Sequence, residues 1–182
     1  MNKIFALIIA LLPVGAAAQD MTALGEANTV ALMRHALAPG TGDPARFTLD
    51  DCSTQRTLSD QGRDQARRIG QAIRDAGIRF DYVWTSQWCR TRETAELLNV
   101  GPVTDQAALN SFFQNRSTAD DQRRDVLNAL SELPQDAKVL FVTHQVNISN
   151  LTGEFTRSGE IIIADRMPDG TVEPKSSILI AP

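Results

Sequence analysis

The chain has 182 residues, of which 42% are hydrophobic and 22% are charged, and its formal net charge is −4. This length suits one domain with enough residues for a sizeable core. The acidic balance and the lack of a long basic run argue against a nucleic-acid-binding surface.

The first residues have the features of a secretory signal peptide. Lys3 is followed by the apolar run 4–12, and three alanines ending at Ala18 precede a polar pair. A charged start, an apolar middle and a small-residue cleavage site define such a peptide. The run is shorter than the roughly 20 residues that span a bilayer, and an uncleaved anchor is the alternative. We therefore predict a signal peptide over 1–18, a single domain over 19–182, a periplasmic or secreted location and no stable membrane insertion.

Strands and helices alternate along the rest of the chain. Short apolar runs between turn residues predict strands, and apolar residues at helical spacing predict helices. The predicted strands are 30–33, 80–85, a short one near 103, 138–143, 160–164 and 177–180; the predicted helices are 59–76, 86–98, 120–133 and 146–151. This order favours an α/β fold, a three-layer α/β/α sandwich with a mostly parallel central sheet.

Two segments, 36–58 and 106–119, contain no clear periodicity. The first is longer than ordinary connections, and such loops are usually functional or mobile. We expect these two loops to determine the substrate specificity of the protein.

The only two histidines each follow a predicted strand. His35, preceded by Arg34, ends the first, and His144 ends the strand at 138–143. In open α/β sheets ligands bind beyond the carboxyl ends of strands. A neutral imidazole can act as a nucleophile and form a phosphohistidine, and a guanidinium can hold phosphate oxygens in a bidentate grip. The pattern predicts one anion site built from both halves of the chain, the alternative being two unrelated histidines.

Arg90 adds a second guanidinium close to a predicted helix start. The free N–H groups and the dipole of a helix N-terminus favour a bound phosphate, and Arg90 would lie about one turn inside the helix. A surface arginine paired with Glu93 or Glu96 is the alternative, which fits Arg92 better.

The chain contains two cysteines, Cys52 in the loop 36–58 and Cys89 beside Arg90. In an exported protein an even number of cysteines permits a disulfide, which would tie the loop to the helix. Two free thiols are the alternative. Two cysteines and two histidines do not give the spacing of a zinc site, so we predict no metal.

In their order along the chain, these motifs resemble those of the histidine phosphatase superfamily, in its phosphoglycerate mutase-like branch. The similarity covers about residues 29–151 and is carried by Arg34-His35, by Ser86, Arg90, Thr94 and Ala95 at the family's spacing, by the helix start with Ser59, Gly62 and Gln65, and by His144. Two positions differ, since Ala36 and Gln145 stand where the family has glycine.

The resemblance implies a role for each matching residue. His35 would be the nucleophile, and Arg34, Arg90 and His144 would form an electrostatic pocket around the phosphoryl group. We add Arg56 and Gln145 as predicted substrate-binding residues. The resemblance implies no metal, and we predict no cofactor.

The chain departs from the family at the acid that protonates the leaving group. Residues 109–113, where mutase-like members carry it, contain no carboxylate, and Gln145 stands where acid phosphatases have aspartate. The candidate substitutes are Asp43, Asp120 and Glu154.

The function predicted from the sequence is a metal-independent phosphomonoesterase that acts through phospho-His35 on a small phosphorylated substrate. Exported lipopolysaccharide core heptose phosphate phosphatases are the nearest parallel in size and compartment, which suggests a phosphorylated sugar of the cell envelope. A phospho-ligand-binding protein with a degenerate pocket and an interaction module with a relic pocket are the alternatives. The sequence does not indicate an oligomeric state.

Overall fold

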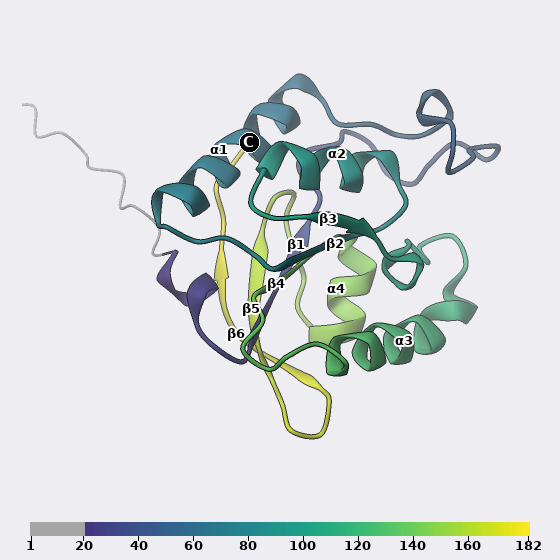
Figure 1. Ribbon diagram of the computed structural model, residues 1–182. Coiled ribbons are helices and arrows are strands. Elements are labelled where there is room, and N and C mark those ends of the chain that lie inside the picture. Colours follow the sequence, from purple (N-terminus) through teal and green to yellow (C-terminus); the bar gives the residue numbers. More distant parts are fainter. Residues whose placement is uncertain (1–20) are drawn as a thin grey trace, which may run out of the picture.

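The computed structural model describes residues 21–182, and the signal-peptide prediction therefore lies outside the described residues. A six-stranded sheet has the order β3-β2-β4-β1-β5-β6, with helices on both faces (Figure 1). The strands are β1 (Thr29–Arg34), β2 (Tyr82–Thr85), β3 (Val103–Asp105), β4 (Val139–Thr143), β5 (Ile161–Arg166) and β6 (Val172–Ile178), and the helices are α1 (Asp60–Asp75), α2 (Cys89–Leu98), α3 (Ala119–Ser131) and α4 (Gln145–Thr152). The predicted α/β sandwich is confirmed.

The sheet is mixed, and its parallel part creates the position of the site. Strands β3, β2, β4 and β1 run parallel, whereas β5 runs antiparallel to β1 and β6 antiparallel to β5. The last paired residues of β1 and β4 are Arg34 and Thr143, which lie opposite each other. His35 and His144 each come one residue later, so the register brings the two histidines to the same edge of the sheet.

Side-chain alternation along the strands divides the core into two layers. Because successive residues of a strand point to opposite faces, Ala31 and Met33 of β1 pack toward α1 and α2, with which they form one buried cluster. Val30 and Leu32 point the other way and join a second cluster with residues of α3 and α4. Almost every residue of the central strands is buried, as expected for strands covered on both faces.

Helix α1 follows the sequence pattern closely. The Ser59 hydroxyl accepts a hydrogen bond from the Gly62 N–H at 3.1 Å and thereby caps the helix. Buried Ala66, Ile69 and Ile73 form the apolar stripe. Gly77 has a φ of +73° and ends the helix, as predicted.

Helix α2 begins later than the sequence predicted. It starts at Cys89, because Ser86 and Gln87 lie in an irregular bend after β2 and Trp88 is the N-cap residue in extended conformation. The Ser86 hydroxyl accepts a hydrogen bond from the Trp88 N–H at 3.3 Å instead of starting the helix. Arg90 is therefore the second residue of α2 and not one turn inside it.

The last strand differs most from the prediction. It begins at Val172 and not at residue 177, and it pairs with β5 through an irregular register between Ile163 and Ala164. Most of residues 173–177 are exposed and polar. An edge strand with one neighbour needs little apolar content, so hydropathy did not reveal it.

Within residues 21–182, no helix is both long and apolar enough to cross a membrane.

Candidate active site

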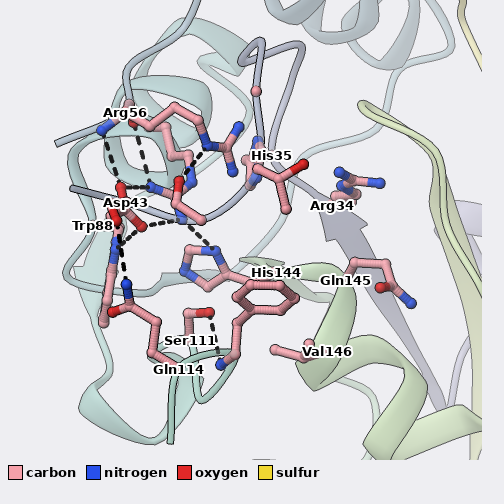
Figure 2. A pocket seen from close by; sticks show the side chains of 15 residues that line it. Arg34, His35, Asp43, Arg56, Trp88, Ser111, Gln114, His144, Gln145 and Val146 are labelled. Atoms are coloured by element: carbon pink, nitrogen blue, oxygen red, sulfur yellow. Dashed lines mark hydrogen bonds and ion pairs between the residues drawn. The ribbon is translucent and has the colours of Figure 1, made fainter. Parts of the chain in front are cut away.

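A cavity of about 170 Å³ opens at the carboxyl ends of β1 and β4 (Figure 2). It is lined by Arg34, His35, Gly40, Thr41, Gly42, Asp43, Arg56, Trp88, Arg90, Ser111, Phe113, Gln114, His144, Gln145 and Val146. All six site residues predicted from the sequence are in this set. They come from two strand ends, the segment 36–58 and the starts of α2 and α4.

Backbone and side-chain hydrogen bonds hold His35 rigidly beneath the cavity. Its Nδ1 lies 2.8 Å from the carbonyl oxygen of Ala36. A carbonyl can only accept, so Nδ1 carries the proton and Nε2 keeps a free lone pair. The Ala36 N–H in turn donates to the Thr94 hydroxyl at 3.1 Å, which fixes the turn after the strand.

His144 lies with its ring centroid 5.7 Å from that of His35. Its Nδ1 faces the Arg90 Nη2 at 3.4 Å, and its Nε2 lies 2.8 Å from the Ser86 hydroxyl. A guanidinium can only donate, so Nδ1 accepts and Nε2–H donates to Ser86. Ser86 is further joined to the Thr91 hydroxyl at 2.6 Å.

Both imidazoles are neutral in this structure. Burial lowers the pKa of His35 well below its usual value, and the charge of Arg90 lowers it further. The same two causes, in the same order, lower the pKa of His144. A neutral His35 with a free Nε2 has the protonation state that a nucleophile requires.

Arg34 and Arg56 supply two cationic groups on different sides of the imidazoles, as Figure 2 shows. Arg34 Nη1 donates to the Thr156 carbonyl at 2.8 Å, and its buried Nε has no hydrogen-bond partner. Arg56 donates through Nε to the Gly42 carbonyl at 2.9 Å and through Nη1 to the Ala38 carbonyl. Burial, together with Arg90, lowers the pKa of Arg56 to about 10, so it stays charged at neutral pH.

Arg90 is paired with a carboxylate. Its Nη1 and Nη2 donate to Asp43 Oδ1 at 2.8 Å and Oδ2 at 3.1 Å, and the two side chains are only 3% and 6% exposed. This bidentate ion pair lies inside the cavity. Sequence reasoning considered Asp43 only as an acid and did not predict the pair.

The predicted disulfide joins Cys52 and Cys89, with Cα atoms 5.7 Å apart. It connects the segment 36–58, which we call the strap, to the first residue of α2. The Gln55 side chain strengthens this connection, because its Oε1 accepts a hydrogen bond from the Cys89 N–H at 2.9 Å. The strap therefore covers the rim of the cavity, as the sequence predicted.

Of the three candidate acids, only Asp43 lines the cavity. Asp120 lies in a surface groove beside the β5–β6 turn, and Glu154 borders a separate depression next to β6. Burial raises the pKa of Asp43, but its hydrogen bonds, chiefly from Arg90, outweigh burial and hold the pKa below its usual value. Asp43 is therefore anionic and lacks a proton to donate at neutral pH.

Several lining residues carried no usable sequence signal. Trp88, Phe113 and Gln114 lie in loops or at a helix cap, where no periodicity identifies a facing side chain. Gln145, which begins α4, was predicted, and its Nε2 donates to Ser149 at 2.7 Å. Within residues 21–182 there is no cluster of three or more His, Cys, Asp or Glu side chains that could hold a metal ion.

Comparisons with known proteins relate one part of the chain to a family and its fold to solved structures. Residues 30–113 match the family described as histidine phosphatase superfamily (branch 1). This segment contains Arg34, His35, Asp43, Arg56 and Arg90. No curated protein matches the chain in sequence.

Solved structures share the fold over most of the chain. A protein assigned as the phosphohistidine phosphatase SixA from Nakamurella multipartitia is 22% identical, with a TM-score of 0.60, over 85% of this chain and 96% of its own. A SixA structure in complex with tungstate is 18% identical, with a TM-score of 0.58, over 82% and 96%. A protein assigned as an alpha-ribazole-5'-P phosphatase from Escherichia coli is 18% identical, with a TM-score of 0.64, over 86% and 98%.

Residues 30–113 therefore resemble the histidine phosphatase superfamily in sequence, and the fold of the chain is similar to that of solved phosphatase structures. The class to which both comparisons point is that of the phosphoric monoester hydrolases.

Proposed function

We propose that this protein is an exported, metal-independent phosphomonoesterase in which His35 is the nucleophile. The observation that carries the proposal is the state of His35. Its Nδ1–H is bound to the Ala36 carbonyl, so its free Nε2 belongs to a neutral ring in a cavity lined by three arginines. A phosphoryl group bound in that cavity would contact the nucleophile and positively charged side chains at the same time.

The reaction has two displacement steps. The Nε2 lone pair of His35 forms a P–N bond while the P–O bond to the leaving group breaks, and the leaving oxygen takes the electron pair and a proton from solvent. Water then attacks the phosphohistidine, the P–N bond breaks with its electron pair returning to Nε2, and inorganic phosphate leaves. Phosphoryl transfer of this kind depends mainly on positioning and charge stabilisation.

Charge in the cavity fits a phosphate monoester dianion. Three guanidinium groups and one carboxylate leave a formal excess of two positive charges while both imidazoles are neutral. Arg34 and Arg56 keep donors that are not committed to carboxylates, and we assign them to the phosphate oxygens. His144, held by Ser86 and Arg90, forms the wall of the phosphate site next to His35.

The remaining wall of the cavity suggests a neutral leaving group. Ser111, Gln114 and Gln145 offer hydroxyl and amide groups, and Phe113 is 46% exposed at this wall. Hydroxyl-rich groups with an apolar face suit such a surface. A phosphorylated sugar of the cell envelope, as in lipopolysaccharide core heptose phosphates, is the first substrate to test.

Export to the periplasm is the second part of the proposal. It rests on the residues 1–18 and is supported by the Cys52–Cys89 disulfide, because such bonds persist in oxidising compartments.

A phospho-ligand-binding protein is the second candidate function. The observation in its favour is that Asp43, the only carboxylate lining the cavity among residues 21–182, is anionic and paired, so a poor leaving group receives no proton from it. Such a protein would bind phosphorylated ligands and release product slowly.

The test is a screen of the purified protein against phosphorylated sugars, nucleotides and lipopolysaccharide core fragments. We expect phosphate release that is abolished in His35→Ala, reduced in both kcat and affinity in Arg90→Ala, and unchanged by EDTA. Loss of activity in EDTA with recovery on adding a divalent metal would contradict the mechanism. A burst of phosphoenzyme without steady release would favour the binding protein.

A further inference from the structure

A buried carboxylate lies inside a cavity that otherwise carries positive charge. Asp43 is on the strap, eight residues beyond the nucleophile His35, and its side chain is 6% exposed. A carboxylate in this position repels a phosphate, so its presence requires an explanation in terms of the reaction.

Both oxygens of Asp43 have two hydrogen-bond donors each. Oδ1 accepts from Arg90 Nη1 at 2.8 Å and from the Arg56 N–H at 3.0 Å. Oδ2 accepts from Arg90 Nη2 at 3.1 Å and from Trp88 Nε1 at 3.0 Å. Four donors on one carboxylate stabilise the anion, which makes Asp43 a fixed acceptor and a poor acid.

Hydrogen bonds from inside and outside the strap hold the backbone around Asp43 in place. The Gln114 side chain donates to the Asp43 carbonyl at 3.2 Å, and Arg56 Nε donates to the neighbouring Gly42 carbonyl at 2.9 Å. Further along, the Cys52–Cys89 disulfide fastens the strap to α2, the helix that carries Arg90. Asp43 and Arg90 are therefore held against each other by covalent and hydrogen-bonded connections.

The pair sets the orientation of the Arg90 guanidinium and of the rings beside it. With both terminal nitrogens bound to Asp43, the Arg90 guanidinium has one plane, in which Nη2 also faces His144 Nδ1 at 3.4 Å. The Trp88 ring, which donates to Asp43, contacts the His144 ring edge-on with centroids 5.3 Å apart. Figure 2 shows Asp43 next to Arg56 and Trp88, with dashed lines for the hydrogen bonds that it accepts from both.

We propose that Asp43 is a positioning residue that fixes Arg90, and through Arg90 the His144 ring, in the geometry that stabilises the transferring phosphoryl group. The inference rests on the proposed phosphatase function and deepens it. In this role Asp43 is neither a proton donor nor an anion that competes with the phosphate for Arg90.

The three roles predict different responses to Asp43→Asn. A positioning residue acts on the phosphoryl group, so its loss lowers the rate equally for all leaving groups. A proton donor matters most for poor leaving groups. If Asp43 competes with the phosphate for Arg90, its replacement by neutral asparagine increases the affinity of the site for anions.

The experiment compares wild type, Asp43→Asn and the control Asp50→Asn, the same change at an exposed position of the same strap. Each is assayed with p-nitrophenyl phosphate, a good leaving group, and with an alkyl phosphate. We expect kcat/KM of Asp43→Asn to fall about 100-fold on both substrates, the scale on which misplaced catalytic geometry affects rates. We expect the control to match wild type.

Anion binding provides a readout that needs no turnover. Orthovanadate resembles the transition state more than inorganic phosphate does, so a preorganised site prefers it. We expect Asp43→Asn to lose most of the preference for orthovanadate over phosphate that wild type shows by calorimetric titration. The anion-binding measurement tests the inference separately from the proposed function, because the preference for orthovanadate can be measured even if wild type turns over neither substrate.

Three results would overturn the inference. They are a loss confined to the alkyl phosphate, tighter binding of both anions with faster turnover, and kinetics and anion preference equal to wild type. If Asp43→Asn does not fold by circular dichroism, Trp88→Phe serves instead. It removes one donor to Asp43 while keeping an aromatic ring beside His144, and we expect the same pattern with a smaller fall.

Discussion

At the scale of single residues, burial decides the charge of the two histidines. His35 and His144 are 2% and 4% exposed and lie close to several arginines. Both effects favour the neutral ring. The chemistry of the site at neutral pH is therefore set by where the chain places the imidazoles and not by their ordinary titration.

This burial predicts acid sensitivity. In the unfolded chain each histidine takes up a proton near pH 6.5, whereas the folded protein resists protonation until well below that value. The unfolded state then binds more protons, so the free energy of unfolding falls as the pH drops below about 6.5, with a slope that approaches about 1.4 kcal/mol per pH unit for each histidine.

Urea unfolding of wild type and of His35→Gln/His144→Gln at pH 7, 6 and 5 measures this difference. We expect a shallower loss of stability in the double variant, which retains the carboxylates and lacks the imidazoles. Equal slopes in the two proteins would contradict the prediction.

At the scale of elements, two glycines of α1 set how closely this helix approaches its neighbours. A Cβ at Gly70 would lie 2.1 Å from the Leu98 carbonyl oxygen of α2, and a Cβ at Gly62 would lie 2.0 Å from the Leu37 carbonyl oxygen. Both contacts are with backbone, which has little freedom to move aside. Leu37 is two residues from His35, so Gly62 supports the site and Gly70 supports only the helix pair.

The two positions therefore give a matched pair of substitutions. In a helix, alanine is usually up to about 1 kcal/mol better than glycine, but the overlap here costs about 1–3 kcal/mol, so both Gly62→Ala and Gly70→Ala should be destabilising. Only Gly62→Ala should also lower kcat. Thermal unfolding measures the loss of stability in both variants, and kinetics with one phosphomonoester measure kcat. A Gly62→Ala variant that is as active as wild type and more stable would contradict both predictions for Gly62.

The disulfide is a second connection between elements. Cys52 and Cys89 are 37 residues apart in sequence, and closing a loop of this length in the unfolded chain corresponds to about 4 kcal/mol of stability in the chain-entropy model. We expect Cys52→Ser/Cys89→Ser to unfold at lower urea concentration than the oxidised wild type by an amount of this order. A variant as stable as wild type would show that the bond adds nothing.

At the scale of the whole molecule, the proposed export and the disulfide make one joint prediction. We expect the chain made with residues 1–18 to be recovered from the periplasm starting at Gln19, with no thiol that reacts with iodoacetamide after denaturation. The same domain made without the leader in a reducing cytoplasm should carry two reactive thiols. Mass spectrometry distinguishes the two forms, and a retained leader or free thiols in the exported form would contradict the prediction.

Much of the fold follows from local patterns in the sequence. The apolar strands β1 and β4 and the stripe of α1 have clear periodicities, because their side chains face a core that spans the sheet. The order of the elements defines an α/β sandwich, and the strand ends identify His35 and His144. The exposed edge strand β6 lacks such a pattern, because most of its side chains face water and need not be apolar.

The pairing of Asp43 with Arg90 was decided only by the tertiary structure. The two residues are 47 positions apart, and Asp43 lies in an irregular segment in which no repeat relates a side chain to the cavity. Its partner is determined by how the strap folds back over α2. The sequence by itself therefore determined the elements and the strand-end imidazoles, because these depend on local periodicity and chain order, whereas the ionic arrangement around them depends on contacts between distant segments.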